Sequence, residues 1–384
     1  MIYLDNGATT NKKPLCVKLA VLKSTFKKNC ANPNRSGYEI SANLASKILD
    51  IRENLANFFN CESAENVIFT SGCTEALNLA LLGTYKKNGH VITTIYEHNS
   101  VLRPLFELKK KYNQNITLIN PNSSGEIDPN EIEKQITDKT NLIACIFTSN
   151  VTGITNQIEK IGSICKKHNI LFLVDCAQSA GHEKIDMQKM NIDMLSIAGH
   201  KGFYSLTGIG ALLVSNKAKQ IIRPIKFGGT GTQSNSPIQP TDFPDGFESG
   251  TANTTGILSL GAGLKFVIKN SKKINNKIEY LTTYLLENLK KIDGIKIYPN
   301  NNKNSGVVSF NLKDYSSNDV GNYLSEKFGI CVRTGLHCAP LVHKHFGTLE
   351  NGMVRISLSY FNKKRHIDKL INALKSLTEK ISQV

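Results

Sequence analysis

The sequence lacks the long apolar runs and the export signal that would assign it to a membrane or to secretion. No stretch approaches eighteen consecutive apolar residues, so we expect no segment to span a membrane. The first residues contain no basic stretch followed by an apolar core, which argues against a secretory signal peptide. The sequence therefore predicts a cytoplasmic protein without a membrane partner.

Paired cysteines are also missing. Nine cysteines are scattered along the chain, and none forms a Cys-x-x-Cys pair. An odd number on a long chain without an export signal argues against a disulfide framework. One dense group of residues that could ligate a metal is present and comprises His337, Cys338, His343 and His345. Its first two members are adjacent in the sequence, which is awkward for tetrahedral zinc coordination. We therefore expect no metal.

Acidic residues are few relative to basic ones. The chain has 47 Lys and Arg against 31 Asp and Glu, a formal net charge of +16. Such an excess can indicate nucleic-acid binding. The basic residues are mostly lysines spread in pairs along the chain and often next to Asn, so solvated helix faces explain them better. We expect no nucleic-acid partner, while weak attraction to RNA or to an acidic protein stays open.

What the sequence does contain, between residues 60 and 260, is a regular alternation of short apolar runs and helical segments. This alternation indicates a mostly parallel sheet covered by helices on both faces. The apolar runs are continuous, as expected for strands buried on both faces. The predicted strands are 66–70, 91–95, 116–119, 142–147, 171–175, 194–198 and 210–214, with helices at 74–85, 100–112 and 159–168. Ligands of such sheets bind beyond the carboxyl ends of the strands.

A loop rich in Gly, Ser, Thr and Pro at residues 228–256 separates this region from the rest of the chain. Long loops in compact domains are usually functional or disordered. The alternation that follows predicts a smaller α/β domain, with helices at about 257–289, 318–328 and 365–382 and strands at 296–298, 306–311 and 353–358.

Two polar motifs follow predicted strands. Lys201 comes after the strand 194–198 between Gly199-His200 and Gly202. A lysine at the rim of a sheet can form a Schiff base if its surroundings lower its pKa, although most such lysines are solvated surface charges. Asp175 ends the strand before it, either as a helix cap or as the partner of a pyridinium nitrogen.

Two further motifs end strands in the same way. Small residues around Thr74 open a helix, where free N–H groups suit a phosphate; a capping box with Ser71 or Thr74 as the cap is equally compatible. His98 follows the strand 91–95, as an ordinary loop residue or as a ring that stacks on a planar cofactor and exchanges protons.

Near the C-terminus, Cys338 lies in a glycine-bearing loop between Arg333 and Pro340 and directly after His337. Cationic neighbours favour the thiolate form of a loop cysteine, whereas most cysteines are buried structural residues. Arg355, in the predicted strand 353–358, has the planar fork that suits an α-carboxylate.

Taken together and in this order, these motifs resemble the class V (fold-type I) aminotransferase superfamily and, within it, the cysteine desulfurases. The resemblance runs from Tyr3-Leu4-Asp5 to the segment around Arg355, and the tight Cys338 loop is most similar to group II desulfurases. It implies an α/β fold with a seven-stranded, mostly parallel sheet in a large domain (12–260) and a smaller α/β domain (1–11 and 261–384).

The resemblance also implies a pyridoxal 5'-phosphate cofactor and a role for each matching residue. Lys201 looks like the Schiff-base lysine that removes the α-proton, His98 like the stacking histidine, and Cys338 like the cysteine that attacks the substrate sulfur. The implied cofactor contacts are Lys201, Asp175, Gln178, His98, Asn150, Thr74, Cys73, His200 and, across a homodimer interface, Thr251. The implied substrate contacts are Arg355, Asn34, Arg35 and Arg333.

The expected reaction converts L-cysteine to L-alanine and leaves a persulfide on Cys338 for a sulfur-acceptor protein. A selenocysteine lyase would use the same residues, so the sequence does not separate the two. A class V transaminase or epimerase would need no thiol, and a basic binding scaffold would need neither Lys201 nor Asp175.

Overall fold

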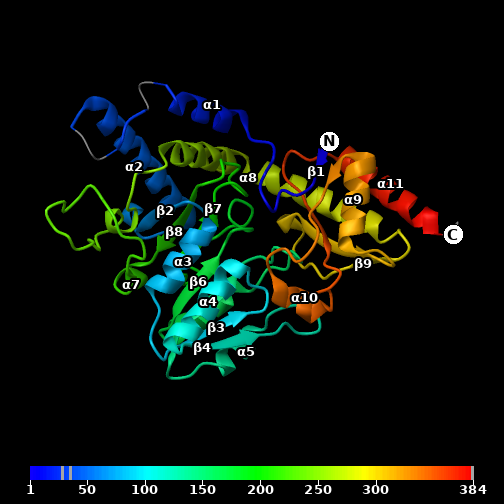
Figure 1. Ribbon diagram of the computed structural model, residues 1–384, viewed down its shortest axis with the longest axis horizontal. Helices are drawn as coiled ribbons and strands as arrows, with labels where there is room; N and C mark the ends of the chain where they lie inside the picture. The colour runs from blue at the N-terminus through cyan, green and yellow to red at the C-terminus, as the bar shows by residue number, and fades with distance from the viewer. Residues whose placement is uncertain (27–29, 34–36, 382–384) are drawn as a thin grey trace.

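A seven-stranded sheet forms the centre of the molecule (Figure 1). The computed structural model describes residues 1–26, 30–33 and 37–381. The strands lie in the order β2-β8-β7-β6-β5-β3-β4, and β8 alone of these runs antiparallel to its neighbours. Their bounds are β2 Val67–Thr70, β3 His90–Thr94, β4 Asn115–Ile119, β5 Thr140–Ile146, β6 Leu171–Asp175, β7 Met194–Ala198 and β8 Gly210–Val214. The predicted mostly parallel seven-stranded sheet is confirmed, with each strand within two residues of its predicted bounds.

Helices cover both faces of this sheet because alternate strand residues point to opposite sides. One buried cluster joins Ile68, Val91 and Leu142 to helices α3 (Cys73–Gly83), α4 (Asn99–Tyr112) and α7 (Asn216–Lys219). The other joins the neighbouring residues Val67, Ile92 and Ile143 to α2 (Glu39–Phe59), α5 (Pro129–Lys134), α6 (Ile158–Lys167) and the first part of α8 (Thr254–Leu289). The carboxyl ends of the parallel strands thus remain the place where a ligand can enter.

A second, smaller sheet lies beyond this layer and packs on the far half of α8 (Figure 1). Its strands pair antiparallel in the order β12-β10-β9, with bounds β12 Val354–Ser357, β10 Val307–Leu312 and β9 Ile295–Ile297. Helices α9 (Ser317–Phe328) and α11 (Lys364–Ile381) pack on it, whereas α10 (Pro340–Phe346) joins the core cluster of the large sheet through Val342. The N-terminal strand β1 (Ile2–Tyr3) pairs with β11 (Ile330–Cys331), so the first residues lie among the last elements of the chain. Because α8 runs unbroken past residue 260, the proposed division at 260–261 stays a prediction.

Two helices before residue 60 were not predicted. The second, α2, buries Leu44, Ile48, Ile51 and Leu55, a helical spacing that is visible in the sequence. The first, α1 (Leu15–Ser24), buries only Val17 and Ser24, so its apolar pattern carries little signal. In the part of the chain that the structure describes, no helix is both long enough and apolar enough to traverse a bilayer.

Candidate active site

A cavity of about 260 Å³ opens where the strands β2, β3, β5, β6 and β7 end. It brings together nearly all residues that the sequence assigned to cofactor contacts. Those that line it are Cys73, Thr74, His98, Asn150, Asp175, Gln178, His200 and Lys201. Parallel strands deliver their C-terminal loops to one edge of a sheet, which is why motifs more than 100 residues apart meet here.

Asp175 and Lys201 form the charged floor of this cavity. Asp175 is 3% exposed, and its Oδ1 accepts a hydrogen bond from the backbone N–H of Ala177 at 2.9 Å. Burial lowers the pKa of the Lys201 amine, an effect that the nearby Cys73 and Asp175 oppose. The Sγ of Cys73 lies 3.4 Å from Asp175 Oδ1, and burial, followed by the charge of Asp175, raises the pKa of this thiol. The cavity therefore holds a neutral thiol between a carboxylate and an amine.

The residue after Lys201 has to be glycine. A Cβ on Gly202 would overlap the carbonyl oxygen of Ala180, and a Cβ on Gly199 would crowd the side chain of Ser205. The backbone on both sides of Lys201 thus packs closely against its neighbours, which fixes where the lysine side chain starts.

A hydrogen-bonded row of polar side chains lines the opposite side of the cavity. His98 precedes α4 as its N-cap, and its Nδ1 lies 2.8 Å from Ser100 Oγ, which in turn lies 2.9 Å from Thr74 Oγ1. Burial lowers the pKa of His98 to about 4, so the ring is neutral, and because its Nδ1 accepts from the backbone N–H of Ser100 at 3.1 Å, the ring hydrogen lies on Nε2. Thr74 lies in the first turn of α3.

The capping-box reading of this helix start is wrong. The residue before α3 is Gly72, which has no side chain, and Ser71 instead donates its backbone N–H to Glu75 at 2.6 Å. The N-terminus of α3 has no side-chain cap of its own, and its positive end faces the cavity together with Thr74.

The Cys338 loop is docked onto the rim of this cavity. Asn150 Nδ2 donates to the carbonyl of His337 at 2.8 Å, and the backbone N–H of Asn99 donates to the carbonyl of Cys338 at 2.7 Å. The thiol itself is exposed and lies outside the lining, with Arg333 Nη2 at 3.7 Å from its sulfur. The structure therefore places Cys338 beside, rather than inside, the cavity that contains Lys201.

Arg355 is almost fully buried, at 1% exposure, in β12 behind the same rim. Its Nη1 donates to the carbonyl of Asn150 at 2.9 Å, and its Nη2 pairs with Asp5 Oδ1 at 2.6 Å. Its Nε has no hydrogen-bond partner within the described residues. Arg355 also pairs by its backbone with Arg333, which links the two arginines to the Cys338 loop.

Among the predicted site residues that the structure describes, Cys338, Arg333, Arg355 and Thr251 do not line this cavity. Thr251 is exposed in the loop before α8 and does not line it. Asn34 and Arg35 lie outside the described residues.

Two polar residues near the site were missed. Asp5 pairs with Arg355, and the sequence pattern had suggested no role for this aspartate. Glu97, next to His98, is 0% exposed; its Oε1 accepts from the backbone N–H of Ile146 at 2.9 Å, and burial raises its pKa to about 8. Each carboxylate follows a strand by two or three residues, β1 for Asp5 and β3 for Glu97, and this spacing is the sequence signal that could have found them.

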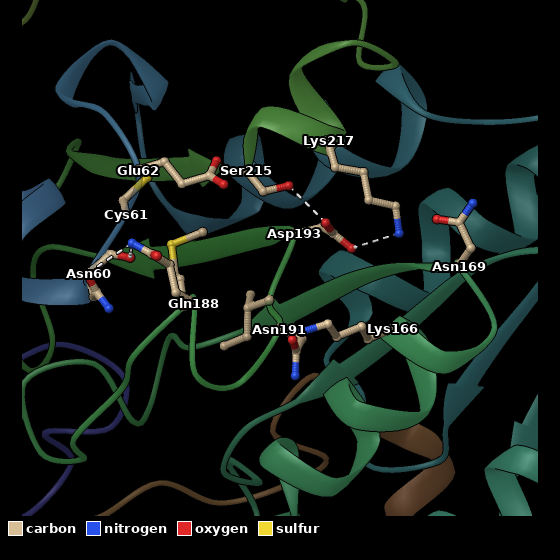
Figure 2. A pocket seen from close by; sticks show the side chains of 12 residues that line it. Asn60, Cys61, Glu62, Lys166, Asn169, Gln188, Asn191, Asp193, Ser215 and Lys217 are labelled. Atoms are coloured by element: carbon tan, nitrogen blue, oxygen red, sulfur yellow. Dashed lines mark hydrogen bonds and ion pairs between the residues drawn. The ribbon is translucent and has the colours of Figure 1, made fainter.

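A second cavity, of about 370 Å³, lies at the opposite edge of the sheet, before β6 and β7 (Figure 2). Its acid, Asp193, accepts hydrogen bonds from Ser215 at 2.8 Å and from the backbone N–H of Phe172 at 2.9 Å, and pairs with Lys217 at 3.7 Å. In Figure 2 dashed lines join Asp193 to Ser215 and to Lys217. By contrast, Asn150 Oδ1 and His200 Nδ1 in the smaller cavity are buried without a partner among the described residues, so the smaller cavity is the candidate active site.

Comparison with known proteins agrees with this geometry. The model of the aminotransferase class-V family matches residues 2–370. The chain belongs to this family. A protein of Borreliella burgdorferi named "Probable cysteine desulfurase" is 35% identical over 395 residues, which cover 100% of this chain and 93% of that protein. One of Pyrococcus abyssi with the same name is 33% identical over 390 residues, covering 99% and 95%.

Solved structures point the same way. The apo structure of a cysteine desulfurase from Thermococcus onnurineus superposes with a TM-score of 0.91 at 31% identity, covering 99% of this chain and 95% of that one. The resemblance seen in the sequence, and the fold class that it implied, are confirmed.

Proposed function

We propose that this chain is a pyridoxal-phosphate-dependent cysteine desulfurase, which converts L-cysteine to L-alanine and receives the sulfur as a persulfide on Cys338. The supporting observation is that the Cys338 loop is hydrogen-bonded through its backbone to the rim of the Lys201 cavity. Asn150, which lines that cavity, and Asn99, which follows His98, make these two bonds. A nucleophile held at the edge of an amine-bearing cavity suits sulfur removal better than transamination, which needs no thiol.

The donors of the cavity fit the cofactor. The amine of Lys201 has a pKa lowered by burial, as reaction with an aldehyde requires, and Asp175 offers a buried carboxylate for a pyridinium nitrogen. Thr74 at the start of α3, together with His200, suits the phosphate. The unpartnered Asn150 Oδ1 and His200 Nδ1 would gain hydrogen-bond partners from a polar ligand. Bound there, pyridoxal phosphate supplies an electron sink for the bonds at the substrate Cα.

The remaining steps belong to this chain's own side chains. Arg355 has an Nε–H without a partner in the described part of the chain, which suits the substrate carboxylate, while Asp5 holds its Nη2. The Lys201 amine takes the α-proton of the substrate and returns it to the Cα atom of the product. The sulfur of Cys338, beside the Arg333 guanidinium, forms an S–S bond to the substrate sulfur as the substrate Cβ–S bond breaks. The electron pair of the broken bond stays on Cβ, which takes up the proton given up by the Cys338 thiol and becomes the methyl group of alanine.

We further propose a homodimer in which the exposed Thr251 reaches the partner's phosphate site, and a sulfur-acceptor protein that collects the persulfide. A persulfide-forming thiol has to stay reduced between turnovers, which supports the cytoplasm as its location. A monomeric mass by analytical ultracentrifugation of the cofactor-loaded protein would contradict the dimer.

The test of the activity uses the purified, cofactor-loaded chain. Alanine and sulfide are measured from L-cysteine with a reductant, with selenocysteine as a parallel substrate, and the Cys338 peptide is examined for persulfide by mass spectrometry. We expect Cys338→Ser to keep the visible absorbance of the bound cofactor and to lose sulfide release, while Cys16→Ser, at another exposed cysteine, keeps both. Undiminished sulfide release from Cys338→Ser would refute the mechanism; faster turnover of selenocysteine alone would indicate the lyase.

A further inference from the structure

Behind Cys338 lies a row of buried polar side chains to which the proposed reaction assigns no role. His337 Nδ1 lies 3.3 Å from His343 Nε2, and His343 Nδ1 lies 2.9 Å from Thr348 Oγ1. At the other end, His337 Nε2 lies 3.5 Å from the carbonyl oxygen of Arg333. His337 is 3% exposed, His343 is 0% exposed and Thr348 is 7% exposed, so water does not compete for the hydrogen bonds of their side chains.

One assignment of protons satisfies all three contacts. A carbonyl oxygen only accepts, so His337 Nε2 carries a hydrogen and donates to Arg333. His337 Nδ1 then accepts from His343 Nε2–H. The hydroxyl of Thr348 donates to His343 Nδ1 at 2.9 Å, which is closer than its other acceptor, the carbonyl oxygen of His343 at 3.4 Å. Each ring must be neutral for this, and burial lowers the pKa of His343 to about 4 and that of His337 well below its usual value, with Arg355 and His343 adding to the effect at His337.

The loop that this row supports has an unfavourable backbone. His337 and Cys338 have φ values of 51° and 57°, in the left-handed region that residues with a Cβ avoid. Asn150 and Asn99 hold the two carbonyls from the cavity side. The His337 ring has separate partners, His343 and the carbonyl of Arg333, so both the backbone and a side chain of the left-handed pair are hydrogen-bonded.

Arg333 connects this clamp to the thiol. Its carbonyl oxygen accepts from His337 Nε2–H and, at 2.7 Å, from the backbone N–H of Arg355. Its guanidinium Nη2 lies 3.7 Å from the sulfur of Cys338. A shift of the His337 ring therefore acts on the backbone of Arg333, the residue whose side chain lies next to the reactive sulfur.

We propose that Thr348, His343 and His337 form a directed hydrogen-bond chain that holds the Cys338 loop in its reactive shape, with His343 as a positioning residue for the thiol. The effect on sulfur transfer rests on the proposed function; the effect on the thiol itself does not.

The experiment measures Cys338 in the full chain loaded with pyridoxal phosphate. The rate of labelling by iodoacetamide is quantified on the Cys338 peptide, and kcat and KM are measured for L-cysteine. His343→Leu removes both ring nitrogens, whereas His343→Gln keeps a donor and an acceptor at nearly the same spacing. Thr348→Val removes only the last donor. His345→Leu, at an exposed histidine two residues along α10, is the matched control.

We expect His343→Leu to slow labelling of Cys338 about tenfold and to lower kcat similarly with little change in KM, since a lost buried hydrogen bond leaves its partner unsatisfied. Thr348→Val should show a smaller loss, His343→Gln should recover most of the rate, and His345→Leu should match the wild type. Labelling of folded His343→Leu at or above the wild-type rate would overturn the proposal. If that variant fails to fold, the proposal is overturned by wild-type labelling in Thr348→Val or by a tenfold loss in His343→Gln. A wild type that labels as expected but releases no sulfide would refute the proposed function instead.

Discussion

Removing the carboxylate of Asp5 is expected to destabilise the protein by far more than removing an equally short ion pair on its surface. Asp5 Oδ1 lies 2.6 Å from Arg355 Nη2, and the side chains of the two residues are 19% and 1% exposed. In Asp5→Ala the guanidinium stays buried and loses its only carboxylate contact among the described residues. A buried charge without a partner is one of the few changes that costs several kcal/mol.

The magnitude follows from the exposure of the two partners. Breaking a fully buried pair from one side costs about 3–5 kcal/mol. Because Asp5 is partly exposed, water can reach the vacated position, and we expect a loss of about 2–3 kcal/mol. The bond of Arg355 Nη1 to the carbonyl of Asn150 remains, so the arginine stays near the site. With one anchor lost, KM for L-cysteine should rise about five- to tenfold, and kcat should change less.

The assay is urea unfolding followed by far-UV circular dichroism, since the chain contains no tryptophan. The matched control is Glu131→Ala, which breaks a pair with Lys134 of the same 2.6 Å length whose side chains are 49% and 67% exposed. That control should cost less than about 1 kcal/mol. Asp5→Asn, which keeps an acceptor oxygen, should fall between the two. Equal losses in Asp5→Ala and Glu131→Ala would refute the reasoning.

Three other predictions follow from buried groups. His343 is protonated near pH 6.5 in the unfolded chain but stays neutral down to about pH 4 in the folded chain, so this residue alone should lower the free energy of unfolding by about 3 kcal/mol as the pH drops across that window. Other buried histidines such as His98 add to the loss, so urea midpoints of His343→Gln should fall by less than those of the wild type. Glu97, with a pKa of about 8, is neutral at pH 7, so the free energy of unfolding of Glu97→Gln should stay within about 1 kcal/mol of the wild type at that pH. Glu97→Ala should lose about 1–3 kcal/mol, because the backbone N–H of Ile146 loses its acceptor. Equal losses in the two variants would contradict this. Gly202→Ala should lose the visible absorbance of bound cofactor, since its Cβ would overlap the Ala180 carbonyl; a normal spectrum would show that the backbone can adjust.

Much of the fold and the cavity could be predicted because both are encoded locally. Continuous apolar runs predicted all seven strands of the large sheet, since β2, β3, β5, β6, β7 and β8 are buried along most of their length and only the edge strand β4 is largely accessible. His98, Asp175 and Lys201 each follow one of these strands, and parallel strands end at a common edge. Chain order and strand polarity were enough to place these residues in one cavity.

The partners that hold the reactive groups could not be predicted this way. Asp5 and Arg355 are 350 positions apart and meet because β1 joins β11 next to β12, a pairing of two-residue strands with no recognisable pattern. Which helix covers which face likewise depends on contacts between distant segments.

By itself, then, the sequence determined the alternating elements, the strand-end motifs and the family to which they belong. Only the tertiary structure decided that Cys338 lies at the rim of the cavity with its backbone in the left-handed region, and that two buried histidines stand behind it. The physical reason is the sequence separation of the contacts. Hydrophobic periodicity acts over a few residues. The packing of α10 against the Cys338 loop, and the hydrogen bonds of that loop to Asn99 and Asn150, join distant segments and leave no local pattern.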